Sequence, residues 1–407
     1  MRRAPLFTIV GLFLLFFGNP DLVAQCVENP VGSGKYEALG GGPCANAIPT
    51  AVPFLRITPD ARTGAMGDAG VAISPDANSM HINTSKLAFA ETDFALSATY
   101  SPWLRSLGLP DVYLAYLSGY KRIDDLQTLG FSLRYFSLGD IQFTNDVGQP
   151  AGFGRPNEFE LAVGFARKLG ENFSVGINGK FIYSNLAAGQ QVGGVDINPG
   201  VAGAADISLY YAVPLDASQL TFGLSLSNMG SKISYTKITN DFLPVNFGFG
   251  SAWQFDLDDY NQLTFTADIN KLMVPTPQHD FIDVDPQNGI NDYREKSFFS
   301  GVLGSWGDAP GGFSEELKEL TYSVGVEYWY DKQFALRAGY FHENPLKGNR
   351  TYITTGLGLK YNVFGINLSY LISTGSTQQN SNPLDKTLRF SLLFDFGANS
   401  SEEVPGA

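Results

Sequence analysis

The stretch Phe364–Ser373, FGINLSYLIS, alternates between two kinds of side chain. Every second residue is large and apolar: Phe364, Ile366, Leu368, Tyr370 and Ile372. Most of the residues between them are small or polar. A period of two places the two sets on opposite faces of a β-strand. The same alternation recurs in Leu220–Ser227 (LTFGLSLS), Leu263–Asn270 (LTFTADIN) and Leu388–Phe396 (LRFSLLFDF).

The polar faces of these strands decide between two β architectures. A soluble β-sandwich brings its apolar faces together in a core, whereas a membrane barrel turns them outward to lipid. In this chain the second face carries Gly, Ser, Thr, Asn and charged residues in nearly every strand. That composition favours a wide barrel with a polar lumen.

We expect fourteen strands, each long enough to cross a bilayer, which takes roughly 9–11 tilted residues. Connections after the even-numbered strands are short and most of the others are longer, so the short turns are expected in the periplasm and the longer loops outside. The sequence predicts an all-β fold, a 14-stranded antiparallel transmembrane β-barrel over 93–397, with both termini periplasmic and a tail at 398–407. The predicted strands are 93–103, 112–121, 127–138, 157–168, 172–185, 200–213, 218–229, 243–255, 261–273, 317–330, 333–343, 350–361, 363–374 and 386–397.

The N-terminus reads as an export signal. Arg2 and Arg3 precede the apolar run Leu6–Phe17, and Ala24 is a suitable cleavage residue, so residues 1–24 are predicted to be a signal peptide. Past the signal, no apolar run approaches the roughly 20 residues of a membrane-spanning helix. The net charge of −13 argues against nucleic acid as a partner.

Cys26 and Cys44 are the only cysteines of the chain. In an exported protein, two cysteines this close favour a disulfide that closes a small loop, and a free thiol is the alternative. Neither has the neighbours of a catalytic thiol.

Residues 25–92 precede the first strand and lack a strand pattern. Gly64–Phe89, GAMGDAGVAISPDANSMHINTSKLAF, mixes turn-forming residues with scattered apolar ones. Because a barrel of this width has a lumen that its own side chains cannot fill, the segment is predicted to fold into it as a plug. The alternative is a linker outside the barrel.

The plug sequence resembles the hatch of the FadL family of outer-membrane transporters. A run of small residues is followed by Asp76-Ala77 and then by a turn from Asn83 to Leu87, although Thr84 and Ser85 replace the Pro and Ala of the family pattern. The resemblance singles out Asp76, Asn83 and Leu87 as plug residues. A FadL-type channel for hydrophobic small molecules is therefore the alternative function.

A narrower resemblance runs over essentially the whole mature chain. Asp308–Leu320 (DAPGGFSEELKEL), Phe334–Arg350 (FALRAGYFHENPLKGNR) and Tyr361–Leu371 (YNVFGINLSYL) are similar to the PorV family, outer-membrane barrels of the type IX secretion system of Bacteroidetes. The resemblance implies a protein that carries cargo and catalyses nothing.

The partners are implied by that resemblance alone. They are the C-terminal signal domains of cargo, a SprA/Sov-like translocon barrel, the sortase PorU with its attachment-complex proteins, and the membrane with its lipopolysaccharide. The implied role is to bind cargo at the cell surface and pass it from translocon to sortase.

The longest connection, 274–316, carries the candidate site. Its apolar residues recur at near-helical spacing and would gather on one side of a short helix: Phe298, Phe299, Val302, Leu303 and Trp306. An extracellular loop of this length and apolar content favours a protein-docking surface. The alternative is that these side chains fold onto the barrel rim as a lid.

Three other groups of residues point to no ligand and no reaction. Asp283, Asp285, Asn288 and Asp292 miss the EF-hand spacing, so a solvated acidic loop is preferred to a calcium site, and no metal or cofactor is predicted. His81, His279 and His342 lie in separate elements, which argues against an enzyme. Mixed charges on the polar strand faces are expected to pair with each other or with the plug rather than to conduct a substrate: Arg134, Lys180, Asp206, Asp268, Glu327, Arg337, Arg389 and Asp395.

Overall fold

The computed structural model describes residues 26–28, 36–38, 45–105, 108–144, 149–187, 189–192, 195–236, 238–277, 292–374 and 384–398. The chain divides into two compact units, Met1–Ala45 and Asn46–Ala407. In the first unit, β1 (Cys26–Glu28) pairs antiparallel with β2 (Tyr36–Ala38). The signal peptide, Cys44 with its predicted disulfide, and nearly all of the tail lie outside the described residues.

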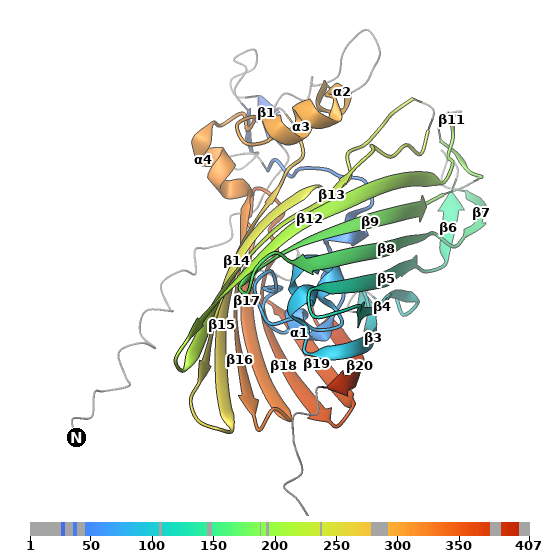
Figure 1. The fold of residues 1–407 in the computed structure, drawn as a ribbon. Coiled ribbons are helices and arrows are strands. Elements are labelled where there is room, and N and C mark those ends of the chain that lie inside the picture. Colours follow the sequence, from blue (N-terminus) through green and yellow to red (C-terminus); the bar gives the residue numbers. More distant parts are fainter. Residues whose placement is uncertain are drawn as a thin grey trace, which may run out of the picture. The chain divides into compact units, whose positions relative to one another are not determined.

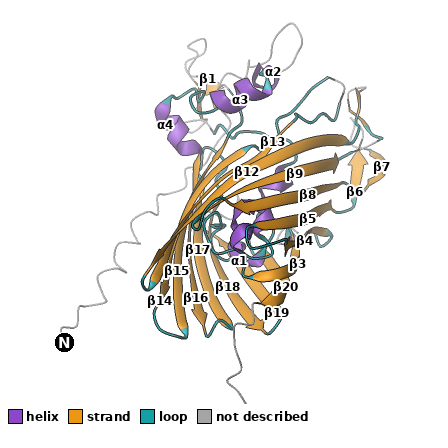
Figure 2. Cartoon of the chain, in the orientation of Figure 1, coloured by secondary structure: helices purple, strands orange, loops and turns teal. Residues whose placement is uncertain are grey.

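The second unit is built around a closed antiparallel barrel of fourteen strands (Figures 1 and 2). Each strand pairs with its neighbours in chain order, and β20 closes the barrel on β3. This confirms the predicted fold. The strands are β3 (Thr92–Pro102), β4 (Val112–Arg122), β5 (Gln127–Leu138), β8 (Asn157–Lys168), β9 (Phe173–Asn185), β12 (Gly200–Leu215), β13 (Ser218–Gly230), β14 (Asn246–Asp256), β15 (Asn261–Leu272), β16 (Leu320–Tyr330), β17 (Phe334–His342), β18 (Thr351–Tyr361), β19 (Phe364–Ser373) and β20 (Leu388–Ala398).

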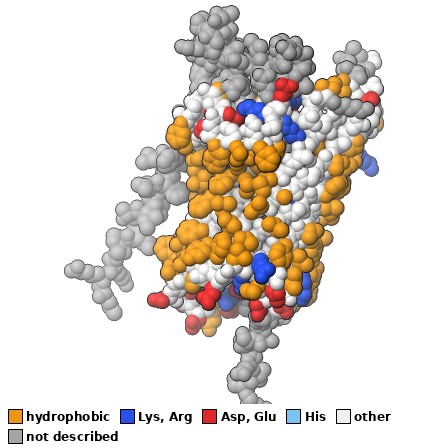
Figure 3. All heavy atoms as spheres, turned by 45° about the horizontal axis from the view of Figure 1, so that its top comes forward, with side chains coloured by type: hydrophobic (Ala, Val, Ile, Leu, Met, Phe, Trp, Pro, Cys, Tyr) orange, Lys and Arg blue, Asp and Glu red, His pale blue; other side chains and the backbone are white. Residues whose placement is uncertain are grey.

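The period-two pattern forms the barrel wall. In β19, Asn367 and Ser369 are buried against the lumen, whereas Phe364 and Tyr370 are exposed on the outside. The same outward set on the other strands is exposed as well, and it forms apolar bands on the face drawn in Figure 3. A surface of this kind is stable in lipid and not in water, so the barrel is a membrane-spanning one. Among the described residues, none of the helices is long and apolar enough to cross a membrane.

The connections differ strongly between the two ends of the barrel. One end, called the turn end, carries short connections such as 331–333 and 362–363. The other, called the loop end, carries the long ones, including 273–319 between β15 and β16 and 343–350 between β17 and β18.

Short helices and hairpins lie in the loop-end connections, and of these the sequence pattern indicated only the helix that begins at Phe298. Two hairpins, each too short to cross a membrane, pair β6 with β7 and β10 with β11. The predicted strand 317–330 begins only at 320, because 317–319 is helical. These elements are β6 (Ile141–Thr144), β7 (Pro150–Gly154), β10 (Gln191–Val192), β11 (Val195–Asp196), α2 (Asp292–Glu295), α3 (Phe298–Gly304), α4 (Phe313–Glu316) and η6 (Leu317–Glu319).

The plug, residues 46–91, lies inside the barrel. It begins at the loop end, where Asn46 N donates to Leu346 O at 2.7 Å and Ala51 N donates to Phe242 O at 3.0 Å. It ends at the turn end, where β3 starts, so it crosses the lumen from one end to the other. This direction differs from the prediction, which placed the N-terminal segment at the same end as the short turns. Its short helices are η2 (Pro53–Arg56), α1 (Ala61–Gly64), η3 (Ser79–His81) and η4 (Thr84–Phe89).

The three plug residues taken from the hatch resemblance all have structural contacts. Asp76 accepts a hydrogen bond from Asn78 N at 2.8 Å and pairs with Arg62 at 3.4 Å. Asn83 donates to Val71 O at 2.9 Å and to Leu209 O of β12 at 3.1 Å. Leu87 is fully buried in an apolar cluster.

The plug backbone touches the wall at β17. A Cβ added at Gly339 would lie 2.1 Å from Gly67 N and 2.1 Å from Met66 C, which are backbone atoms that cannot swing away. We expect Gly339→Ala to displace this part of the plug and to lower the free energy of unfolding by about 1–3 kcal/mol, as overpacking does. Hydrogen exchange in residues 63–70 is the measurement. Gly179→Ala is the matched control, because a Cβ there meets open space. Equal exchange in the two variants would contradict the tight contact.

Candidate functional site

Helix α3 carries four of the five apolar residues of the predicted docking surface, and the fifth, Trp306, follows just after it. Ser297 caps its N-terminus by accepting a hydrogen bond from Ser300 N at 3.3 Å, which fixes where the helix starts. Val302 is buried and Phe298 is half-buried, and both pack against Val245 and Met273. Because Phe298 and Val302 are four residues apart, their side chains lie on the same side of the helix.

The other three residues of the set are more exposed. Phe299 is 74% exposed, Leu303 is 70% exposed and Trp306 is 49% exposed. The five residues therefore divide: Phe298 and Val302 pack on the barrel, Phe299 and Leu303 are exposed, and Trp306 is half exposed and also touches the barrel.

Helix α3 packs on the outer wall of the barrel and not over its opening. Trp306 packs edge-on against Phe247 of β14, with 5.5 Å between ring centroids. Phe247 lies opposite Lys271 of β15 in the sheet. Each is two residues away from an outward-facing residue, Phe249 or Ile269, so both side chains also point out of the barrel. These contacts place this segment against the outward face of β14 and β15 at the loop end.

A buried ion-pair network, called the α4 network, holds the second helix. Lys271 Nζ lies 2.9 Å from Glu316 and 2.5 Å from Glu319, and Lys347 Nζ lies 2.6 Å from Glu315 and 3.0 Å from Glu319. All five side chains are at most 10% exposed. The network joins the loop to β15 and to the 343–350 connection.

The first plug residue also contacts this network. Asn46 Nδ2 donates to Glu315 at 3.2 Å and to Pro277 O at 2.9 Å. Thr276 Oγ1 donates to Glu319 at 2.7 Å. The loop helix and the start of the plug are therefore held by the same carboxylates.

The segment of α4 and η6 buries its charged side chains and exposes apolar ones, which is the reverse of an ordinary surface helix. Its carboxylates point inward, whereas Phe313 is 78% exposed and Leu317 is 47% exposed. Sequence reasoning missed these two residues, because a charged FSEELKEL segment reads as solvated on its polar side. Buried charges and exposed large apolar side chains together reverse the usual distribution. Such a face indicates a surface that another molecule covers.

The pH dependence of the α4 network follows from Glu315. Burial raises the pKa of its carboxyl, but the hydrogen bond and charge of Lys347 lower it, to about 2 overall. A lowered folded-state pKa means that the pair stabilises the helix above pH 4.5, the ordinary value, and that this is lost as the pH falls towards 2. We expect hydrogen exchange in 313–319, corrected for its intrinsic pH dependence, to stay constant from pH 8 to 5 and to rise below pH 4.5. Lys347→Met should flatten that rise, because without the cation the folded-state pKa of Glu315 is no longer held far below its ordinary value; an unchanged profile in this variant would rule out the pair as its cause.

The lumenal charges pair with each other or with the plug. Glu327 of β16 lies between Arg62 of the plug at 2.7 Å and Arg337 of β17 at 2.6 Å. Asp268 accepts from Gly70 N at 2.6 Å and Val71 N at 2.9 Å. Of the remaining predicted charges, Arg134 donates to plug carbonyls, Lys180 pairs with Asp206, Arg389 approaches Asp68, and Asp395 pairs with Lys360 near the turn end.

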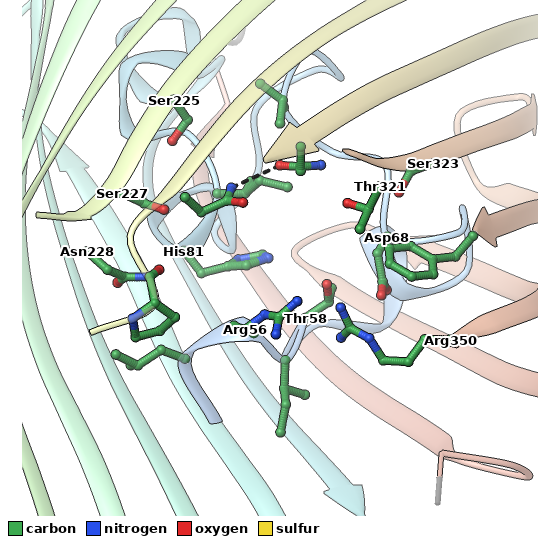
Figure 4. Close-up of a pocket in the computed structure, with 18 residues that line it drawn as sticks. Arg56, Thr58, Asp68, His81, Ser225, Ser227, Asn228, Thr321, Ser323 and Arg350 are labelled. Atoms are coloured by element: carbon green, nitrogen blue, oxygen red, sulfur yellow. Dashed lines mark hydrogen bonds between the residues drawn. The ribbon is translucent and has the colours of Figure 1, made fainter. Parts of the chain in front are cut away.

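A cavity of about 130 Å³ remains between the plug and strands β13–β16 (Figure 4). Its lining is dominated by hydroxyl, amide and charged side chains, among them Ser225, Asn270 and Arg350. A channel for hydrophobic molecules needs an apolar lumenal site. The lining of this cavity is instead mainly polar.

The histidines of the described chain do not form a catalytic group. His81 Nδ1 lies 2.6 Å from Asn78 O inside the plug, and its Nε2 lies 3.3 Å from Asp60. His342 is in β17, with Nδ1 3.5 Å from Thr351 Oγ1. His279 lies outside the described residues, as do Asp283, Asp285 and Asn288 and the side chain of Asp292. Among the side chains that are described, no cluster of His, Cys, Asp or Glu could hold a metal ion.

Solved structures of similar fold have low sequence identity to this chain. The Ralstonia pickettii toluene transporter TbuX is 11% identical over 83% of this chain and 98% of its own, with a TM-score of 0.48. A Pseudomonas aeruginosa FadL homologue is 13% identical over 87% and 100%, with a TM-score of 0.43. The P. putida toluene transporter TodX is 12% identical over 82% and 98%, with a TM-score of 0.46. No curated protein matches the chain.

The family comparison is more specific. The sequence model of the type IX secretion system protein PorV matches residues 43–279, more than half of the chain. The matched region contains the plug and the strands from β3 to β15. The chain therefore belongs to the PorV family of type IX secretion system proteins.

Proposed function

We propose that this protein binds the C-terminal signal domain of secreted cargo at the cell surface and passes it from the outer-membrane translocon barrel to the sortase and attachment complex. Membership of the PorV family supports the pathway. In the proposed orientation the turn end and the tail 398–407 face the periplasm, and the loop end, with Asn46, faces outside. The barrel acts as a carrier and not as an enzyme.

The exposed apolar face of α3 and α4 supports the carrier role. We call Phe299, Leu303, Trp306, Phe313 and Leu317 the docking surface. Lys271 connects its two halves, since its Nζ lies 5.6 Å from the Trp306 ring centroid and 2.9 Å from Glu316. Aromatic side chains of this kind contribute most of the energy in protein interfaces.

The lumen supports a carrier more than a channel. A carrier needs its rim and can keep its lumen closed, whereas a FadL-type channel needs an apolar path. The described plug is tied to the wall by buried ion pairs such as Arg62–Glu327, and the described cavity has a polar lining. Neither feature favours passage of a hydrophobic molecule.

The test of the docking surface is the double variant Phe299→Ala/Trp306→Ala. Losing two aromatic anchors costs about 2 kcal/mol or more of binding energy, or roughly 30-fold in affinity. We expect cargo to accumulate in the periplasm of cells that carry only this variant, with barrel assembly unchanged. Attached and retained cargo are measured by fractionation.

Phe153→Ala is the matched control, because Phe153 is 79% exposed on a different loop-end connection. It should leave cargo delivery unchanged. Normal delivery in the double variant would remove the docking surface from the proposal. Loss of uptake of a hydrophobic solute, with secretion intact, in cells lacking the protein would favour the channel instead.

A further inference from the structure

The polar cavity inside the barrel has the properties of a small-ligand site. It is enclosed by the plug on one side and by the inner faces of β13–β16 on the other, and the labelled side chains of Figure 4 converge on it. Arg56 and Asp68 come from the plug, and Arg350 comes from the 343–350 connection. The polar residues of its lining are Arg56, Thr58, Asp68, His81, Ser225, Ser227, Asn228, Asn246, Asn270, Thr321, Ser323 and Arg350.

Several polar atoms of the lining have no hydrogen-bond partner within the described chain. Ser323 is 1% exposed and its Oγ has no hydrogen-bond partner, and Asp68 Oδ1 accepts no hydrogen bond although it lies 3.9 Å from Arg389 Nη2. Leaving a buried polar atom unpaired costs about 1–3 kcal/mol, so such atoms normally bond to water or to a ligand. The cavity wall thus offers unused hydrogen-bonding groups.

The charges around the cavity favour an anion. Arg350 Nε and Nη2 lie 2.7 and 2.9 Å from Glu343, and Arg56 Nη2 lies 3.2 Å from the same carboxylate. Two guanidinium groups therefore share one carboxylate. Each has five N–H donors, so donors remain for a further acceptor.

The third guanidinium nearby belongs to Arg389, at 3.9 Å from Asp68. Its Nε and Nη1 are buried without a hydrogen-bond partner. Guanidinium N–H donors without a partner thus lie beside the cavity, on Arg389 behind Asp68 and on the two arginines that share Glu343.

We propose that this cavity binds a small hydrophilic anion with a phosphate or carboxylate group. Guanidinium groups recognise both groups through paired N–H donors. The cavity measures about 130 Å³ and is partly open, so it has room for the anionic group of a ligand. The hydroxyl and amide side chains of β13–β16 would bond the rest of the solute.

Equilibrium dialysis of labelled inorganic phosphate against the purified full-length protein tests the site at constant ionic strength. We expect saturable binding at one site per chain and competition by acetate. Arg350→Gln should weaken binding about tenfold, as loss of one charge-assisted hydrogen bond does. Arg155→Gln is the matched control, because Arg155 is 85% exposed, pairs with Asp140 and does not line the cavity.

A second variant keeps the test valid if Arg350→Gln does not fold. Ser323→Val removes the unpartnered hydroxyl and adds bulk to the cavity, so it should also weaken binding. Non-saturable binding, equal affinity in every cavity variant, or competition by neutral galactose but not by acetate would each overturn the assignment.

Discussion

Glu327→Gln is expected to lower the free energy of unfolding by about 3–5 kcal/mol, because it removes the carboxylate that two buried guanidinium groups share. Arg62 Nε and Nη2 donate to Glu327 at 2.9 and 2.7 Å, and Arg337 Nε donates at 2.6 Å. Glutamine keeps the shape of the side chain but not its charge. Urea unfolding of the purified barrel in lipid vesicles is the measurement.

The position of Glu327 makes the loss larger than that of a surface pair. Its side chain is 2% exposed, and those of Arg62 and Arg337 are 8% and 0% exposed. A buried charge that loses its partner keeps its desolvation cost without the compensating attraction. Because Arg62 belongs to the plug, hydrogen exchange should rise most around α1.

Arg155→Gln serves here too as the control. The Arg155–Asp140 pair is short, at 2.6 Å, but its side chains are 85% and 59% exposed. Exposed pairs contribute about 0–1 kcal/mol. Similar destabilisation by the two substitutions would mean that the plug is not held by its buried charges.

Lys271→Met is expected to detach α4 and thereby to reduce cargo delivery, because the detached segment carries Phe313 and Leu317 of the docking surface, although neither residue is itself substituted. The substitution leaves Glu316 and Glu319 without the cation of β15. Breaking such a buried contact costs about 3–5 kcal/mol, and a loop helix of four residues has little other stability to offset it. Cargo retention in the periplasm and hydrogen exchange in 313–319 are measured together.

The control for this prediction is Lys360→Met. Lys360 also pairs with a carboxylate, Asp395 at 2.7 Å, but its side chain is 43% exposed and the pair lies towards the turn end. It should change neither measurement. If Lys271→Met increased hydrogen exchange but left cargo delivery normal, the α4 network would have no role in cargo transfer.

The barrel could be predicted closely from the sequence. The predicted strand 127–138 matches β5 residue for residue, and the others begin and end within three residues of the structure. The reason is physical: lipid outside and a polar lumen inside impose a local alternation on every strand. The turn and loop lengths then fixed the number and order of the strands.

The candidate site could be predicted only in part. Helical spacing located the apolar residues of α3, because that pattern is local. It could not show that Val302 faces the barrel and Phe299 faces away, since which side is buried depends on Phe247 and Met273 far along the chain. Phe313 and Leu317 were missed because nothing near them in sequence reveals that the neighbouring glutamates are neutralised.

The sequence by itself therefore determined the fourteen strands and the existence of a plug, and it predicts the export signal. All three follow from composition and short-range periodicity. Only the tertiary structure decided that the plug begins at the loop end, that α4 carries its charges inward, and that a polar cavity remains beside the plug. Each of these depends on pairs of residues far apart in the chain, such as Asn46 with Glu315 and Arg62 with Glu327. Burial and ion pairing are properties of both partners at once, so a pattern read along one segment cannot reveal them.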